Sequence, residues 1–379
     1  MLAALFIAAS SGTSFAQAGC DDIDGMNALD ATIRANYPKN STVKAAIDAG
    51  KSYLEKFGAC EAPKEFVDWL KVQMPKWEER KIKEDERVWL KERFDRFDAG
   101  ITGEKYADTY AAGKELLSKQ PDNLNIMVPM GLIGLYQSYN KKYDFNDDTV
   151  RFAKMAIAKL KAGGVATKKN KAGEDVFGVF QFEMTKNDAI SEMTYAIAFI
   201  NYWAKNDKKG ALPYYYEVTQ LPGKNQNEPR IYGTIGDYYV GEAARLGSEI
   251  TAMIEKQKAM ATDEEKEKID VDIKAKVGLF NGYSERAIDA FARAHKVAPT
   301  ATANDKTYKD GLLKTIQDLY KRRFDKETGM DAYLATTTAK PFPNPTSEVT
   351  PIIDPDPVTT TSTTGTTPTN GKTATAIKP

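Results

Sequence analysis

Apolar residues recur at helical spacing along almost the whole chain. This pattern limits the possible folds more than any other feature of the sequence. Near the N-terminus one helical face is marked by residues three or four positions apart, namely Ile23, Met26, Leu29 and Ile33. The next segment, 41–58, opens with Ser-Thr and closes at Gly58, which are typical helix start and stop signals. Strand-like composition is confined to VFGVFQF (176–182), either a short extended loop or a hairpin arm. These patterns predict an all-α fold.

Internal repeats add a second constraint. AGKSYLEK (49–56) and AGKELLSK (112–119) share the pattern AGK-x-x-L-x-K. The small Ala-Gly pair in each lets one helix approach another closely. Repeated helical hairpins leave apolar faces that only neighbouring hairpins can cover, so the chain is expected to stack them.

A more specific pattern lies between residues 195 and 299. YGTIGDYY (232–239) fits the aromatic-x2-L-G-x2-Y pattern of a first repeat helix, and AIDAFARAHKVAP (287–299) fits the A-x3-F…P pattern of a second. Residues 195–218 form a complete, looser repeat. The positions that fill the pattern are Tyr195, Ala198, Tyr202, Ala211, Tyr215, Val218, Tyr232, Ile235, Gly236, Tyr239, Ala287, Phe291, Ala294 and Pro299.

On these residues the chain resembles tetratricopeptide (TPR)-like helical repeat proteins, clearly over 195–299 and more loosely over 41–160. The resemblance implies an antiparallel helical-hairpin array, an α-solenoid, over residues 19–340. It also implies that the small residues Gly236 and Ala287 allow paired helices to approach, while Tyr and Phe fill the gaps between hairpins. A related helical repeat would produce the same pattern.

One repeat departs from the usual length of about 34 residues, because its second-helix pattern begins about 40 residues late. The intervening segment contains no Pro, and ATDEEKEK (261–268) supplies a turn, a cap and an acidic first helical turn. We therefore expect an extended helical hairpin at about 229–298. Its facing apolar positions are Leu246, Ile250 and Met253 on one arm and Ile269, Ile273 and Val277 on the other.

The N-terminus carries the features of an export signal over residues 1–18. LAALFIAAS (2–10) is an apolar core, and cleavage patterns end at Ala16 or Ala18, although the usual basic start is missing. The protein is therefore expected in the periplasm, the cell envelope or the extracellular space.

The chain contains two cysteines, Cys20 and Cys60, and an even number in an exported chain favours a disulfide. A lipid anchor on Cys20 is the disfavoured alternative, because Gln17 occupies the position where a lipoprotein signal carries Leu or a similar residue. At the other end, residues 341–379 are rich in Pro and Thr. They predict a disordered tail, a linker or a glycosylated stalk.

The remaining composition argues against several kinds of function. Lys+Arg and Asp+Glu both number 53, so no basic surplus favours nucleic acid. No segment of the mature chain reaches the roughly 18 consecutive apolar residues of a membrane span. The single histidine, His295, has no nearby Cys or His partner, and phosphate-binding and nucleophile-elbow motifs are missing. We therefore expect a protein that is not an enzyme and holds no cofactor or metal.

The first functional expectation is an exported scaffold that binds another protein or peptide on its helical surface. This follows from the resemblance, because repeat arrays present extended concave surfaces. The alternative is a glycan- or solute-binding envelope protein, suggested by the tyrosine clusters YYYEV (214–218) and DYYVGEA (237–243). Packing between repeats is the more economical explanation of these rings, since several already occupy repeat positions.

Overall fold

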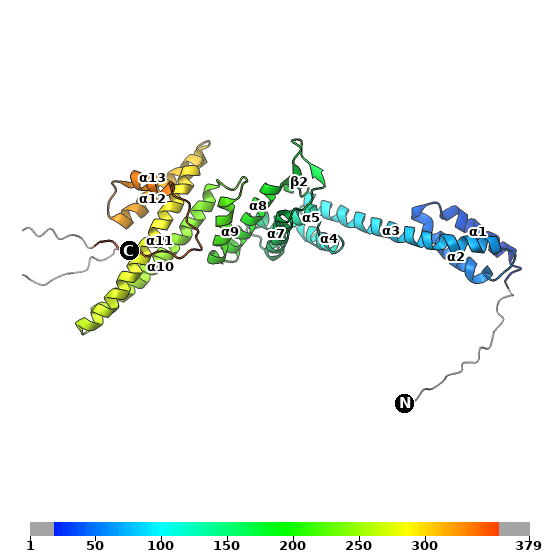
Figure 1. Ribbon diagram of the computed structural model, residues 1–379, viewed down its shortest axis with the longest axis horizontal. Helices are drawn as coiled ribbons and strands as arrows, with labels where there is room; N and C mark the ends of the chain where they lie inside the picture. The colour runs from blue at the N-terminus through cyan, green and yellow to red at the C-terminus, as the bar shows by residue number, and fades with distance from the viewer. Residues whose placement is uncertain (1–18, 356–379) are drawn as a thin grey trace, which may run out of the picture. The chain divides into compact units, whose positions relative to one another are not determined.

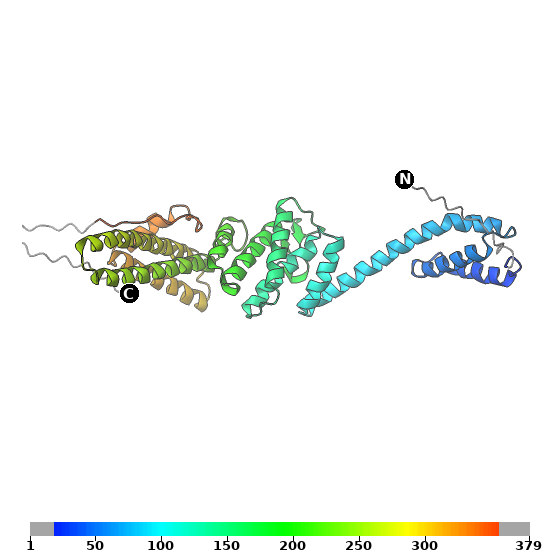
Figure 2. The same ribbon diagram turned by 90° about the horizontal axis from the view of Figure 1, so that it is seen from below.

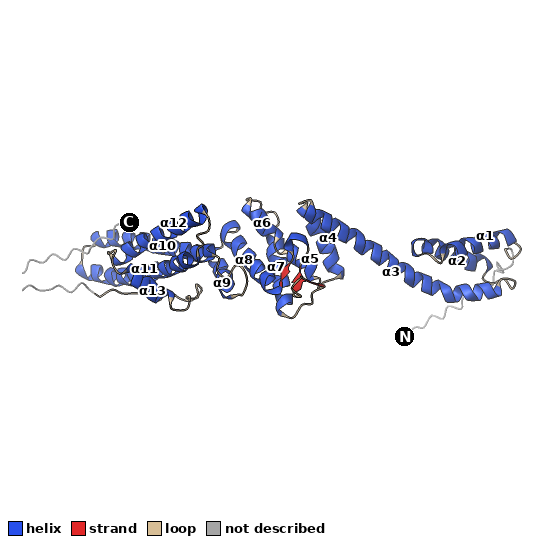
Figure 3. Ribbon diagram, turned by 90° about the horizontal axis from the view of Figure 1, so that it is seen from above, coloured by secondary structure: helices blue, strands red, loops and turns tan. Residues whose placement is uncertain are grey.

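The computed structural model describes residues 19–355, which are predominantly helical (Figures 1 and 3). The predicted all-α class is confirmed at that level. The expected signal peptide, residues 1–18, and residues 356–379 of the expected tail lie outside the described part. The helical region expected as one domain over 19–340 divides after Lys119 into two compact units.

The first unit consists of four helices within residues 19–119. α1 packs against α2, α2 against α3, and α3 against α4. Asp22 begins α1 by accepting a hydrogen bond from the Gly25 amide, a typical N-cap. The bounds are α1 (Ile23–Asn36), a 3-10 turn (Asn40–Thr42), α2 (Val43–Phe57), α3 (Lys64–Thr102) and α4 (Tyr106–Lys119).

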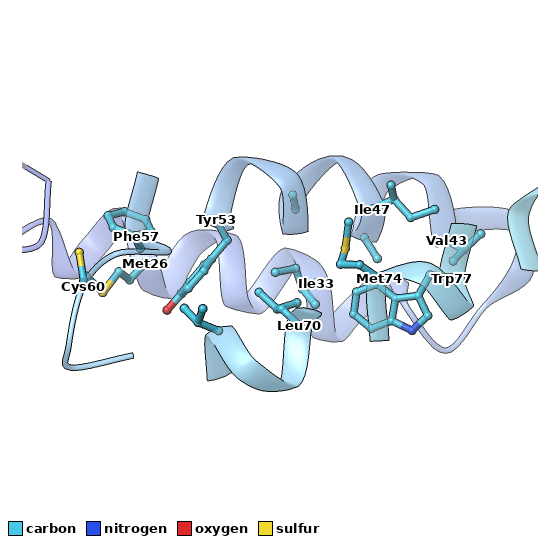
Figure 4. Close-up of a cluster of buried hydrophobic side chains, with 13 residues drawn as sticks. Met26, Ile33, Val43, Ile47, Tyr53, Phe57, Cys60, Leu70, Met74 and Trp77 are labelled. Atoms are coloured by element: carbon cyan, nitrogen blue, oxygen red, sulfur yellow. The ribbon is translucent and has the colours of Figure 1, made fainter. Parts of the chain in front are cut away.

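The core of this unit lies between α1, α2 and the start of α3. Figure 4 shows Ile33, Leu70 and Met74 pointing into the space between the helices, where all three are buried. Gly50 of the AGK echo permits this packing, because a Cβ there would lie 2.5 Å from the Met74 sulfur. The close approach of α3 to α2 therefore explains why position 50 of α2 is a glycine.

The predicted disulfide is present and joins Cys20 to Cys60. Cys20 precedes α1 and Cys60 follows α2, so the bond ties together the ends of the first two helices. The Cys20 sulfur is thereby engaged, which excludes a thioether-linked lipid in this form of the protein.

The second unit, residues 120–355, begins with short helices and a small sheet. Its three strands pair antiparallel in the order β1-β2-β3, with Val176 opposite Thr185. The strand-like run 176–182 supplies only part of β2, since its second half folds as a 3-10 turn. The bounds are α5 (Leu124–Met130), α6 (Ile133–Tyr139), α7 (Asn146–Lys161), β1 (Lys168–Lys169), β2 (Asp175–Phe177), a 3-10 turn (Phe180–Phe182), β3 (Met184–Thr185), α8 (Lys186–Phe199), a π-turn (Ile200–Ala204) and α9 (Lys208–Gln220).

Two long helices dominate the C-terminal part, and they pack along each other as a hairpin (Figures 1 and 2). They meet at residues 259–262, which overlap the start of the expected turn segment 261–268, and Thr262 and Glu265 form a capping box at the second helix. Of the six apolar residues expected between the arms, all but Leu246 belong to one small cluster near the turn. The bounds are α10 (Pro229–Lys258), α11 (Asp263–Val297), α12 (Ala303–Phe324) and α13 (Met330–Thr338).

Residues 341–355 correct the expected start of the disordered tail. This segment, which we call the strap, lies along the α10–α11 hairpin, as the orange-red coil in Figure 2 shows. Phe342 and Val349 are buried, and Ile352 is hydrogen-bonded to α11. The Pro-rich composition of this segment predicted disorder. Its three apolar anchors pack on helices that are distant in the sequence, so the sequence pattern did not indicate them.

Candidate functional site

A groove of about 610 Å³ lies on one side of the second unit. Its walls come from α8 with its π-turn, from α10 and from α12, and Phe291 of α11 also lines it. The three wall helices alternate along the chain with α9 and α11. α9 packs behind α8 and α10, and α11 packs behind α10 and α12. The lining side chains include Tyr195, Phe199, Trp203, Arg230, Asp237 and Tyr308. We call this site the aromatic groove.

The π-turn positions the most exposed aromatic ring of the groove. Here the Lys205 amide donates to the Ile200 carbonyl, an i to i+5 bond that inserts one extra residue into the helix end. Tyr202 turns inward and is 3% exposed, while Trp203 turns outward and is 54% exposed. The local change in helix register thus places a tryptophan face in solvent beside the groove.

The opposite wall depends on two glycines. A Cβ on Gly233 of α10 would approach the Tyr308 hydroxyl at 3.3 Å, so this glycine makes room for the tyrosine of α12. A Cβ on Gly311 of α12 would meet nothing within 4 Å, which leaves the groove open at that point. Arg230 and Asp237, both exposed, give the wall one positive and one negative group.

Aromatic rings extend the groove wall towards α6. Tyr139 of α6 stacks edge-on against Phe199 with ring centroids 5.0 Å apart, and Phe199 lies 6.0 Å from Tyr195. Burial raises the pKa of Tyr195 to about 12, and its hydroxyl is hydrogen-bonded to that of Tyr139. Rings of this kind offer an apolar face and a polar edge to a ligand.

Most of the expected repeat-packing residues come together in the core behind this groove. One buried cluster contains Ala198, Tyr202, Ala211, Tyr215, Val218, Ile235, Tyr239 and Ala287, with Tyr195 and Tyr232 packed against it. Phe291 and Ala294 belong to the adjoining cluster. Gly236 approaches Phe291 so closely that a Cβ would lie 2.8 Å from the ring. Pro299 is exposed and lies beyond the end of α11.

The tyrosine clusters serve chiefly in packing. Tyr215 and Tyr239 are each 1% exposed, and Tyr214 and Tyr216 are half-buried. Burial raises the pKa of Tyr215 well above its usual range, and a hydrogen bond from Trp203 opposes only part of that shift. The cluster at 214–216 therefore offers no open stacking platform.

A second, more polar cleft of about 1090 Å³ lies beside the first turn of α9, between α10, α11 and the strap. Tyr238 and Tyr283 contribute rings, and Lys208, Glu242 and Arg245 contribute charges. Gly241 also lines this polar cleft, with nothing within 4 Å of its Cβ position. Mixed charges around aromatic rings suit a small polar ligand.

Within residues 19–355 the structure contains neither a metal-ligand cluster nor a membrane-spanning helix. No group of three His, Cys, Asp or Glu side chains in this part could hold a metal ion. Nor does any helix there have the length and hydropathy needed to cross a bilayer. His295 is half-buried near the end of α11, where burial and Lys309 lower its pKa.

Sequence reasoning missed the groove residues Trp203, Arg230 and Tyr308. The repeat pattern marks packing positions, and groove positions lie on the neighbouring helical face, where it specifies no residue type. Adjacent Tyr202 and Trp203 were a weak signal, because neighbouring helical side chains point about 100° apart, so one of the two rings lies away from the centre of the buried face. The π-turn has no signature in the sequence.

Comparison with known proteins identifies no relative: no protein-family model, no curated protein and no solved structure matches this chain.

Proposed function

We propose that this chain is an exported, TPR-like scaffold that binds an extended segment of a partner protein in the aromatic groove. The single observation that carries the proposal is that α8 with its π-turn, α10 and α12 supply all of the groove lining except Phe291, while α9 and α11 pack against these helices. Stacked helical hairpins present every second helix to the same side, and such arrays bind partners on that surface. The proposal assigns the protein no catalytic role.

The chemistry of the groove indicates what it would hold. Aromatic and Arg side chains contribute most of the binding energy in protein interfaces, and Trp203, Tyr308 and Arg230 are available there. A single opposite charge, Asp237, allows the groove to pair with a segment carrying one basic residue. An extended peptide with apolar side chains and few charges fits this lining best.

The experiment uses the two open glycines as a matched pair. Gly311→Leu would place a side chain in the aromatic groove, whereas Gly241→Leu would place one in the polar cleft. Both changes replace a helical glycine without a clash, so each variant should remain folded. A photo-crosslinking residue at position 315, which lines the groove, would capture the partner in the full chain, and the partner is then purified for direct titration.

Affinity for the purified partner should fall at least about tenfold in Gly311→Leu, which corresponds to about 1.4 kcal/mol. It should be unchanged in Gly241→Leu. A partner that binds both variants as well as it binds the unmodified chain would refute the groove as its site.

The alternative function, binding of a glycan or solute, now rests on the polar cleft. Of the two tyrosine clusters that suggested it, the rings at 214–216 are buried or half-buried, whereas Tyr238 of the cluster at 237–243 lines this cleft. Titration of the protein with envelope glycans would test it, because Gly241→Leu should then abolish binding while Gly311→Leu leaves it intact.

A further inference from the structure

One face of α11 holds the strap through contacts that resemble the recognition of a peptide. The α11 residues in contact with it lie three or four positions apart between Gly278 and Arg293, so they form a single stripe along the helix. The strap runs antiparallel to α11, with Phe342 beside Arg293 at one end and Ile352 beside Gly278 at the other.

The backbone of Ile352 is held on both sides. Its amide donates to the Gly278 carbonyl at 2.8 Å, and its carbonyl accepts from Asn281 Nδ2 at 3.0 Å. A side chain at Gly282 would block the same approach, since a Cβ there would lie 2.5 Å from the Thr350 carbonyl oxygen. Hydrogen bonds to both the amide and the carbonyl of one residue recognise the peptide backbone. A sheet edge recognises an added strand in the same way.

Arg286 holds the middle of the strap. Its guanidinium donates to the carbonyls of Ser347 at 3.1 Å and Glu348 at 2.8 Å, and to the Ser347 hydroxyl at 3.1 Å. Apart from the bond to the Ser347 hydroxyl, these bonds use main-chain atoms that any residue supplies. They therefore fix the path of the segment more than its sequence.

An aromatic anchor fixes one end. The Phe342 ring is 9% exposed, lies 5.4 Å from the ring of Tyr232 and has the Arg293 guanidinium 5.1 Å above it. Apolar contact combined with a cation over the ring favours an aromatic residue at this position.

A carboxylate anchor fixes the other end. Arg323 of α12, with a side chain 3% exposed, makes two parallel bonds to Asp354, at 2.8 and 2.9 Å. Glu285 of α11 pairs with the same guanidinium at 2.8 Å. A buried guanidinium with this fork geometry selects a carboxylate.

We propose that this face of α11 is a binding site for an extended peptide that carries an aromatic residue and, twelve positions later, a carboxylate, and that residues 342–354 fill it in cis. The site lies outside the aromatic groove and does not depend on the function proposed for that groove.

The surroundings of the strap indicate that the site would persist without it. Glu285 would continue to neutralise Arg323 after Asp354 had left. The cluster that joins α11 to α12, built around Ile288, Phe291 and Ile316, contains no strap residue. Phe342 is the strap's contribution to the neighbouring core cluster, where it lies at the edge beside Tyr232.

The test releases the strap in the full chain and supplies it again as a peptide. A Phe342→Ala, Asp354→Ala double variant should lose both anchors and retain its helical content. A fluorescent peptide of residues 341–355 should then bind this variant saturably, and bind the unmodified chain at least about tenfold more weakly because its site is filled.

Matched peptides separate specific recognition from general stickiness. Asp354→Asn in the peptide should weaken binding at least about tenfold, because the peptide loses its two charged bonds to the Arg323 guanidinium. Glu348→Gln removes the same charge from an exposed side chain and should leave affinity unchanged. Equal binding of both peptides, or a folded released variant that binds neither, would overturn the proposal.

A second design covers the case in which the double variant fails to fold. A protease site inserted at residues 339–341 would allow the strap to be cut after the chain has folded. The proposal requires that the cut chain stays folded and that the labelled peptide replaces the cut strap. Unfolding on cleavage, or no exchange, would show that the strap is an integral part of the fold.

Discussion

At the scale of single residues, two glycines of α10 have opposite effects on stability. On α10, Gly236 faces Phe291 at a distance too short for a Cβ, whereas Gly241 faces open space. Gly236 is required for the packing of α10 against α11. Gly241 lowers the stability of the helix and permits no close contact in exchange.

Gly236→Leu should therefore lower the free energy of unfolding by about 1–3 kcal/mol, because the new side chain displaces the Phe291 ring. Gly241→Leu should raise it by up to about 1 kcal/mol through helix propensity alone. Urea unfolding followed by circular dichroism measures both. Equal effects would mean that the close approach of α10 and α11 does not depend on the glycine.

His295 gives a second prediction, since it is the chain's only histidine. Burial lowers its pKa and Lys309 lowers it further, against a smaller opposing effect of Asp310. The unfolded chain, with a pKa of about 6.5, then binds the proton more readily than the folded chain. Stability should therefore rise with pH between the lowered pKa and about 6.5.

Nuclear magnetic resonance would follow the single imidazole directly, in the folded chain and in urea. The ring should titrate at lower pH in the folded chain, and His295→Gln should flatten the pH dependence of stability in this interval. A folded value equal to the unfolded one would contradict the prediction.

At the scale of elements, the end of the α10–α11 hairpin is stabilised by a small core of its own. Ile250, Ile269 and Ile273 are each at most 8% exposed and form a cluster around the turn. Charged residues cover the rest of this end, so its stability rests on few apolar contacts. Such a segment can open locally while the remainder of the unit stays folded.

Ile250→Ala should cost about 2–5 kcal/mol of local stability by leaving a cavity in this cluster. Hydrogen exchange should then accelerate for amides between 250 and 277 and stay unchanged in α8 and α9. Val271→Ala, at a position 64% exposed, is the control and should have little effect. Acceleration that spreads through α8 would show that the hairpin end is not an independent unit.

At the scale of the whole molecule, the chain divides into two units, and the disulfide lies entirely within the first. Closing a loop of 40 residues restricts the unfolded state of that unit alone. The entropic model assigns about 4 kcal/mol to such a loop.

The double change Cys20→Ser, Cys60→Ser should therefore lower the melting temperature of the first unit and leave that of the second unaltered. Differential scanning calorimetry should resolve two transitions, of which one moves. Reduction and alkylation of the unmodified protein provide an independent check. A single transition that moves as a whole would indicate that the two units unfold together.

The sequence by itself determined those features whose physical basis is local. Helical spacing and caps gave the helical class, and ATDEEKEK located the turn of the long hairpin, because bonds and contacts within one helix span only three or four residues. Two cysteines left one intramolecular pairing.

The groove and the strap were decided by the tertiary structure alone. Asp354 contacts Arg323 across 31 positions and Ile352 contacts Asn281 across 71. The exposure of Trp203 depends on a π-turn whose stability comes from the helices packed around it. Such contacts leave no periodic trace, since each is formed only after distant helices have packed together.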